Sequence, residues 1–154
     1  MKKTIQTIVL AALCLFLSNA ARTQTAALKI GDQMPDITIN NVINYKSNSL
    51  KLSDFKGKLL ILDFWATWCG ACVFTFPKTD SLQKAFEGKI QFLSIAYQSE
   101  KEIIPFIQRI EKSKGLKIIT AMGDNELSKL FPHHVFPHYV WIGTDGRVQA
   151  ITSN

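Results

Sequence analysis

Two cysteines separated by two residues are the part of this sequence best suited to do chemistry. They stand in the segment Trp68-Cys69-Gly70-Ala71-Cys72. Such a pair occurs in structural zinc sites, in haem attachment sites and in redox-active disulfides. Haem attachment requires a histidine directly after the second cysteine, where this chain has Val73. A zinc site would need further ligands, and the candidates are the histidines of the chain: His133, His134 and His138.

The elements predicted around the pair favour the redox interpretation. The nearly continuous apolar run from Leu59 to Trp65 is typical of a buried central strand, and a helix is predicted from Cys69 to Glu87. At a helix N-terminus, unpaired backbone N–H groups and the positive end of the dipole stabilise a thiolate, so we expect a low pKa for Cys69. Cys72 follows nearly one turn later, close enough for a small disulfide. We expect it to be the more buried, resolving thiol.

An acidic residue interrupts the apolar strand before the pair. Asp63 lies six residues before Cys69, where an unpaired ionised carboxylate would be costly. Burial should raise its pKa and let it accept and return a proton near neutral pH. The alternative is a polar residue satisfied at a strand edge. We predict a catalytic role for Asp63.

The rest of the chain alternates strands with helices. Ser99 and Glu102 form a capping box, and Gly115 is a suitable helix end. Pro105 predicts a bend or an irregular first turn in that helix. The predicted elements are paired strands at 36–40 and 50–52, a strand at 59–65, a helix at 69–87, a strand at 89–97, a helix at 99–113, a strand at 117–120, a helix at 125–131, and a hairpin of 138–142 with 147–151. This order predicts an α/β sandwich around a mixed sheet.

The first twenty residues read as a signal peptide. Lys2 and Lys3 precede a mostly apolar stretch from Ile5 to Leu17, and small residues at 18 and 20 predict cleavage before Ala21. A membrane anchor is the alternative, but the stretch is shorter than the roughly 20 residues that span a bilayer. Cys14 would leave with this segment. We therefore expect an exported, periplasmic or extracytoplasmic protein with a short lead-in at 21–27, one domain at 28–154 and no stable membrane insertion.

Composition excludes several classes. With 47% hydrophobic residues the chain is not predominantly disordered, and three cysteines are too few for a disulfide scaffold. The formal charge of +6 falls to +4 when Lys2 and Lys3 are removed. Because the remaining lysines are scattered, we expect no nucleic-acid partner.

Four segments together resemble the thioredoxin superfamily, and within it the exported TlpA/ResA-like thiol-disulfide oxidoreductases with a redoxin-like domain. The active-site segment is Asp63-Phe64-Trp65-Ala66-Thr67-Trp68-Cys69-Gly70-Ala71-Cys72; the others are 30–36, 52–58 and Phe136-Pro137 followed by 145–148. The resemblance covers residues 28–148. It implies a thioredoxin-like three-layer sandwich with an N-terminal hairpin extension. Relatives continue into a C-terminal helix that covers one face of the sheet. We therefore expect either a truncated domain or cover of that face by another domain or subunit, and marginal stability for residues 21–154 alone.

The resemblance also implies roles for single residues. Pro137 matches a cis-proline that faces the cysteines, and Asp63 would lie beneath Cys72 to assist its deprotonation. Pro77 would bend the active-site helix. The predicted substrate-binding residues are Trp68, Gly70, Ala71, Phe136, Pro137 and His138.

The predicted function is thiol–disulfide exchange with exported proteins through the Cys69–Cys72 pair, most simply as a reductase supplied by a membrane electron donor. No cofactor is expected. One alternative is a copper metallochaperone using Cys69, Cys72 and a loop histidine, although such proteins space their cysteines by three residues. A peroxiredoxin is excluded, because its P-x-x-x-T-x-x-C motif fails at Leu62 and Ala66.

Overall fold

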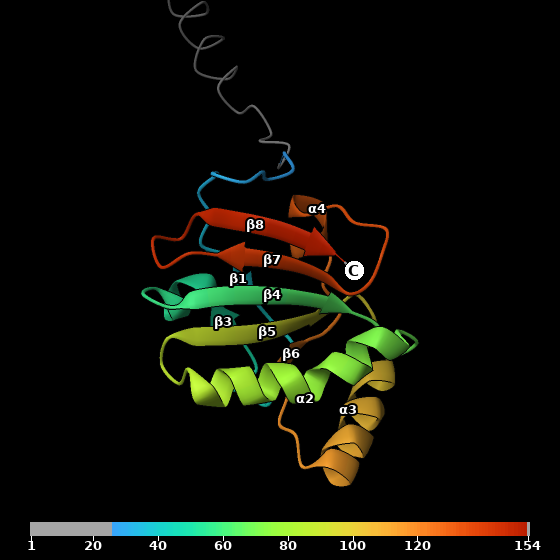
Figure 1. Cartoon of the computed structure of the whole chain (residues 1–154). Helices are drawn as coiled ribbons and strands as arrows, with labels where there is room; N and C mark the ends of the chain where they lie inside the picture. Colours follow the sequence, from blue (N-terminus) through green and yellow to red (C-terminus); the bar gives the residue numbers. More distant parts are fainter. Residues whose placement is uncertain (1–25, 154) are drawn as a thin grey trace, which may run out of the picture.

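The computed structural model describes residues 26–153, and the chain folds there as a mixed sheet with elements on both faces (Figure 1). The predicted signal peptide and most of the lead-in lie outside the described residues. The elements are β1 (Thr38–Ile39), β2 (Val42–Ile43), β3 (Leu50–Lys51), the 3-10 helix η1 (Leu52–Phe55), β4 (Leu59–Trp65), α2 (Gly70–Ala85), β5 (Ile90–Ala96), α3 (Glu100–Lys114), β6 (Thr120–Ala121), α4 (Glu126–Leu130), β7 (His138–Ile142) and β8 (Val148–Ser153).

The main sheet has six strands in the order β2-β6-β5-β4-β7-β8. Strand β4 is central: it pairs in parallel with β5 and antiparallel with β7. A strand flanked on both sides and covered on both faces should be almost entirely apolar, which explains the run from Leu59 to Trp65 that only Asp63 interrupts. The short strands β1 and β3 pair with each other in a separate two-stranded sheet.

Two hydrophobic cores lie on opposite faces of the main sheet. On one face, Leu62 and Phe64 of β4 pack with residues of η1, α4 and the β1–β3 pair. On the other, Trp65 packs with both cysteines and with α2 and α3. Figure 1 shows the same three layers, with α2 and α3 on one side of the sheet and α4 behind it. The predicted thioredoxin-like α/β sandwich is confirmed.

Most predicted elements are present with ends displaced by a few residues. Strand 59–65 and strand 138–142 have the predicted bounds, and α3 continues through Pro105. The strand expected at 36–40 is only Thr38–Ile39, although it pairs with Leu50–Lys51 as predicted. Strand β2 and helix η1 were not predicted. The expected N-terminal hairpin is thus a small separate sheet, while β2 joins the main sheet beside β6.

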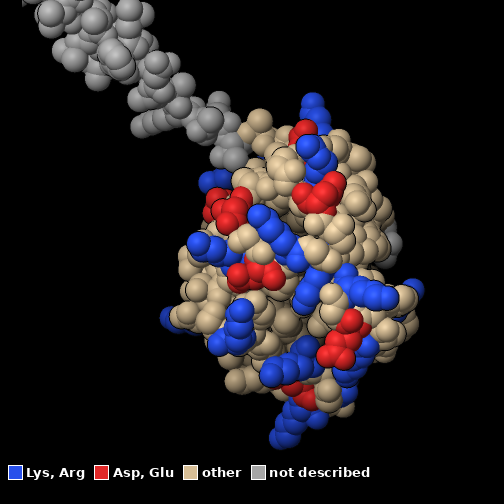
Figure 2. All heavy atoms as spheres, turned by 90° about the vertical axis from the view of Figure 1, so that its left-hand side faces the viewer, with Lys and Arg blue, Asp and Glu red and all other residues tan. Residues whose placement is uncertain are grey.

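The surface described shows mixed charge. Figure 2 views the end of the sheet where β4 begins and α2 ends, and its Lys and Arg side chains lie among Asp and Glu. Of the helices between residues 26 and 153, none has the length and apolar character needed to cross a membrane.

Candidate redox site

The two cysteines form a disulfide where the loop after β4 enters α2. Cys69 is the N-cap of α2, and its Sγ accepts a hydrogen bond from the backbone N–H of Cys72 at 3.1 Å. The disulfide is asymmetric, because Cys69 retains 6% exposure and Cys72 none. Gly70 and Ala71 between them are exposed. Cys72 is therefore the more buried of the two cysteines, as the sequence predicts. The N–H donor at Cys69 would also stabilise a thiolate there.

Asp63 is a buried carboxyl group without a hydrogen-bond partner among the described residues. It is 1% exposed, and neither carboxylate oxygen has a partner. Because Trp65, two residues on, packs with Cys72, Asp63 lies on the face of the sheet that α2 covers. Burial raises the pKa of Asp63 to about 8. Such a group exchanges protons near neutral pH, as expected from its place in an apolar strand.

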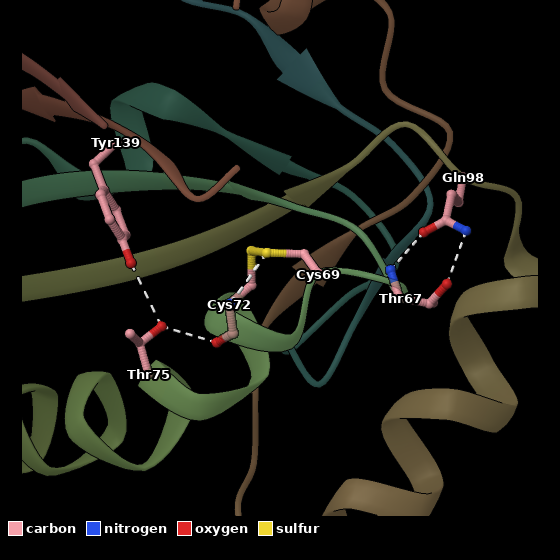
Figure 3. Close-up of a disulfide and its surroundings, with 6 residues drawn as sticks. All are labelled: Thr67, Cys69, Cys72, Thr75, Gln98 and Tyr139. Atoms are coloured by element: carbon pink, nitrogen blue, oxygen red, sulfur yellow. Dashed lines mark hydrogen bonds between the residues drawn. A yellow bond between two sulfur atoms is a disulfide. The ribbon is translucent and has the colours of Figure 1, made fainter. Parts of the chain in front are cut away.

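Gln98, which follows the end of β5 by two residues, is hydrogen-bonded to the loop before Cys69. The side chain of Gln98 accepts from Thr67 N–H at 2.7 Å and donates to Thr67 Oγ1 at 2.9 Å (Figure 3). It also donates to Glu102, whose carboxylate accepts from the Ser99 hydroxyl and backbone. These bonds lower the pKa of Glu102, with Ser99 contributing most. The active-site loop is therefore tied to the start of α3.

Aromatic side chains cluster around Trp68, the residue directly before Cys69. Trp68 is 65% exposed and donates its indole N–H to the hydroxyl of Tyr97 at 3.1 Å. The ring of Phe136 lies 5.5 Å from that of Trp68 and 6.3 Å from that of Tyr97, between ring centroids. The peptide bond between Phe136 and Pro137 is cis. The predicted substrate residues Trp68 and Phe136 are thus brought together.

His138 lies on the other face of the sheet. Its ring is 5.7 Å from that of Phe64, within the core that α4 covers, and it stacks on His133 at 4.7 Å. Burial, with a smaller effect of His133, lowers the pKa of His138. Since His133 packs against Phe136, the pair lies behind the proline loop. His138 therefore borders that loop from inside the fold, while the disulfide lies on the α2 side.

Two hydroxyl residues next to Cys72 were not predicted. The Thr75 hydroxyl donates to the carbonyl of Cys72 at 2.8 Å and lies 3.4 Å from the hydroxyl of Tyr139 (Figure 3). The side chains come from α2 and β7, 64 residues apart in sequence. Gln98 and Tyr97 were likewise missed. The one signal in the sequence was the place of Gln98, between a strand end and the Ser99 capping box.

The copper alternative has no support. Within residues 26–153, no three His, Cys, Asp or Glu side chains are grouped so that they could hold a metal ion. His138, one of the proposed ligands, belongs to the opposite core.

Comparisons with known proteins agree with this geometry. The Redoxin family description matches residues 29–153. The thioredoxin-like protein YneN of Bacillus subtilis is 36% identical over 80 residues, which span 49% of this chain and 45% of that protein. The thiol-disulfide oxidoreductase ResA of Oceanobacillus iheyensis is 24% identical over 97% of this chain and 78% of its own.

Solved structures share the fold. A thiol:disulfide interchange protein of the thioredoxin family from Chlorobium tepidum superposes with a TM-score of 0.66 at 22% identity, over 83% of this chain and 89% of that one. The chain therefore belongs to the Redoxin family, has a thioredoxin-like fold, and is similar to proteins named as thiol-disulfide oxidoreductases.

Proposed function

We propose that the protein reduces disulfides of exported proteins by thiol–disulfide exchange, with Cys69 as nucleophile and Cys72 as resolving thiol. The observation that carries this proposal is the asymmetry of the pair. Cys69 retains 6% exposure and its Sγ accepts an N–H bond at the helix N-terminus, whereas Cys72 has no exposed surface. Exchange by two thiols in sequence needs this difference, because only the first has to meet the substrate.

In the first step, the Cys69 thiolate attacks one sulfur of a substrate disulfide. A bond forms between Cys69 Sγ and that sulfur, the substrate disulfide breaks, and its second sulfur leaves as a thiolate. Trp68, Gly70 and Ala71 border this approach, as does the loop of Phe136 and Pro137. An extended substrate segment could pair with the backbone of that loop.

In the second step, the Asp63 carboxylate removes the thiol proton of Cys72. Cys72 Sγ then bonds to Cys69 Sγ, and the mixed disulfide breaks. The electron pair goes to the substrate sulfur, which leaves and takes up a proton. The substrate disulfide has been reduced and the cysteine pair oxidised. A pKa of about 8 suits Asp63 to this proton transfer near neutral pH.

Renewed turnover requires electrons from a donor of reducing equivalents. We place that donor in a membrane and the protein in an exported compartment, since the predicted signal peptide and the resemblance to exported relatives support both. Whether the protein reduces or oxidises its substrates follows from the reduction potential of the cysteine pair. A value well below that of the compartment supports a reductase, and a value above it supports an oxidant.

The test measures insulin reduction by the full chain and by single cysteine variants. Cys69→Ser should abolish turnover, and Cys72→Ser should accumulate a mixed disulfide that dithiothreitol releases. Cys14→Ser is the matched control and should retain full activity. Retained turnover in Cys69→Ser would refute the assignment.

A further inference from the structure

A chain of hydroxyl groups joins strand β7 to the turn of α2 that carries Cys72. Thr75 donates to the Cys72 carbonyl at 2.8 Å. A threonine hydroxyl has one proton, so in the 3.4 Å contact between Thr75 and Tyr139 the donor is the tyrosine. The order is therefore Tyr139 O–H to Thr75, and Thr75 O–H to the backbone of Cys72 (Figure 3).

The register of the sheet places this chain beside the buried carboxyl group. Tyr139 is the direct partner of Asp63 across β4 and β7, and Ser94 is its partner on β5. Asp63 is therefore flanked by Tyr139 from β7 and by the uncharged Ser94 from β5, on the face of the sheet that α2 covers. Burial, then the neighbouring Asp63, raises the pKa of Tyr139, which keeps its hydroxyl protonated and able to donate.

Tyr139 also lies on the open side of that turn. With Thr75, Lys78 and Trp141 it lines a groove of about 250 Å³ between α2 and the β7 side of the sheet. On the opposite side α2 is supported by the core shared with α3. The hydroxyl chain is thus a link between α2 and β7 at the edge where a groove, rather than side-chain packing, separates them.

We propose that Tyr139 is a positioning residue for the second half of the reaction: through Thr75 it holds the Cys72 turn over Asp63, in line with the mixed disulfide. This rests on the proposed function. The step it supports is the attack of Cys72 on Cys69 after Asp63 has taken the proton. The first step depends on Cys69, which is held by its own loop and by Gln98.

The experiment separates the two steps with one reagent. Reduced full-length protein carrying Cys14→Ser, so that Cys69 and Cys72 are its only thiols, is mixed with Ellman's reagent, 5,5'-dithiobis(2-nitrobenzoate), in a stopped-flow instrument. Attack by Cys69 releases one nitrothiobenzoate, and resolution by Cys72 releases the second. Tyr139→Phe should leave the first phase unchanged and slow the second about fivefold, which corresponds to about 1 kcal/mol at 1.36 kcal/mol per tenfold.

Thr75→Val breaks the same chain from the other end. It should slow the second phase by a similar factor, and the double variant should be no slower than either single one, because both remove one linked interaction. Tyr45→Phe, the same chemical change far from the site, should change neither phase. For Tyr139→Phe, the rate of the second phase plotted against pH should keep its midpoint and have a lower maximum.

Three results would overturn the proposal. They are an unchanged second phase in both single variants, losses that add in the double variant, and a moved midpoint with unchanged height, which would mean that Tyr139 acts on the charge of Asp63. Failure of the proposed function looks different: the wild-type protein would then show no release of nitrothiobenzoate that depends on Cys69.

Discussion

Replacement of Asp63 by asparagine should stabilise the protein, by an amount that grows with pH. Burial raises the pKa of Asp63 from 3.8 to about 8 in the folded protein. Between these two values the unfolded chain has released a proton that the folded chain still holds. Each pKa unit corresponds to 1.36 kcal/mol, so folding of the wild type loses about 4 kcal/mol by pH 7 and about 6 kcal/mol above pH 8.

The sign follows from the raised pKa. A group with a raised folded pKa contributes stability that is complete below its unfolded pKa and is lost as the pH rises through the folded pKa. Asparagine has nearly the shape of protonated aspartic acid and meets the same unpartnered surroundings. The two proteins should therefore be about equally stable near pH 4. The unfolding free energy of Asp63→Asn should exceed that of the wild type by about 4 kcal/mol at pH 7. The difference should reach about 6 kcal/mol and stop growing above pH 8.

The assay is urea unfolding of the oxidised protein, followed by tryptophan fluorescence between pH 4 and pH 9. The quantity of interest is the difference in unfolding free energy between variant and wild type. Asp36→Asn is the control of opposite sign. The exposed Asp36 carboxylate accepts from the Ser53 hydroxyl and backbone, which lowers its pKa. The Asp36 carboxylate therefore adds to the unfolding free energy at neutral pH, and this contribution disappears in acid. A difference for Asp63→Asn that stays flat from pH 4 to pH 8 would refute the reasoning.

Two further substitutions test the surroundings of the site. Gln98→Leu removes both hydrogen bonds to Thr67 and leaves the Thr67 N–H without the Gln98 oxygen as acceptor. The unfolding free energy in urea titrations should therefore fall by about 1–3 kcal/mol. The control Gln149→Leu, at an exposed position, should change it little. Because burial and His133 lower the pKa of His138, its neutral form supports folding above about pH 6.5, and that support is lost as the pH falls. His138→Phe should therefore lose less stability than wild type between pH 7.5 and pH 5.5, and parallel curves would contradict this.

The elements that the sequence predicts well are those with a strong local pattern. Strand β4 is apolar at nearly every position because β5 and β7 flank it and both faces are covered. The capping box at Ser99 marks the start of α3, and Gly115 follows its end in the left-handed conformation. Strands β1 and β2 have two residues each, too few for a periodic pattern. Their existence depends on partners elsewhere in the chain, such as Ala121 of β6 for Val42.

In the site, too, local sequence predicts some residues, whereas the place of others depends on distant parts of the chain. A short motif carries Cys69, Cys72 and Asp63, so local sequence suffices to propose them together. The side on which His138 lies depends on the phase of β7 relative to β4, and that is fixed only when the strands pair. Because Asp63 is opposite Tyr139, the tyrosine shares the α2 face and His138 must take the other. No pattern within β7 could have decided this.

The two cysteines are held by different parts of the sheet, and this is a physical basis for the order of action proposed above. The loop before Cys69 is fastened by Gln98 and Tyr97, at the end of β5. The turn at Cys72 is fastened by Tyr139 of β7 through Thr75. Strand β4 lies between these two strands and carries Asp63. In the proposed mechanism, a substrate that displaces Trp68 breaks its hydrogen bond to Tyr97, which is one part of the β5 attachment. The β7 attachment, and with it the geometry that Cys72 needs for the second step, can stay in place while the substrate is still bound.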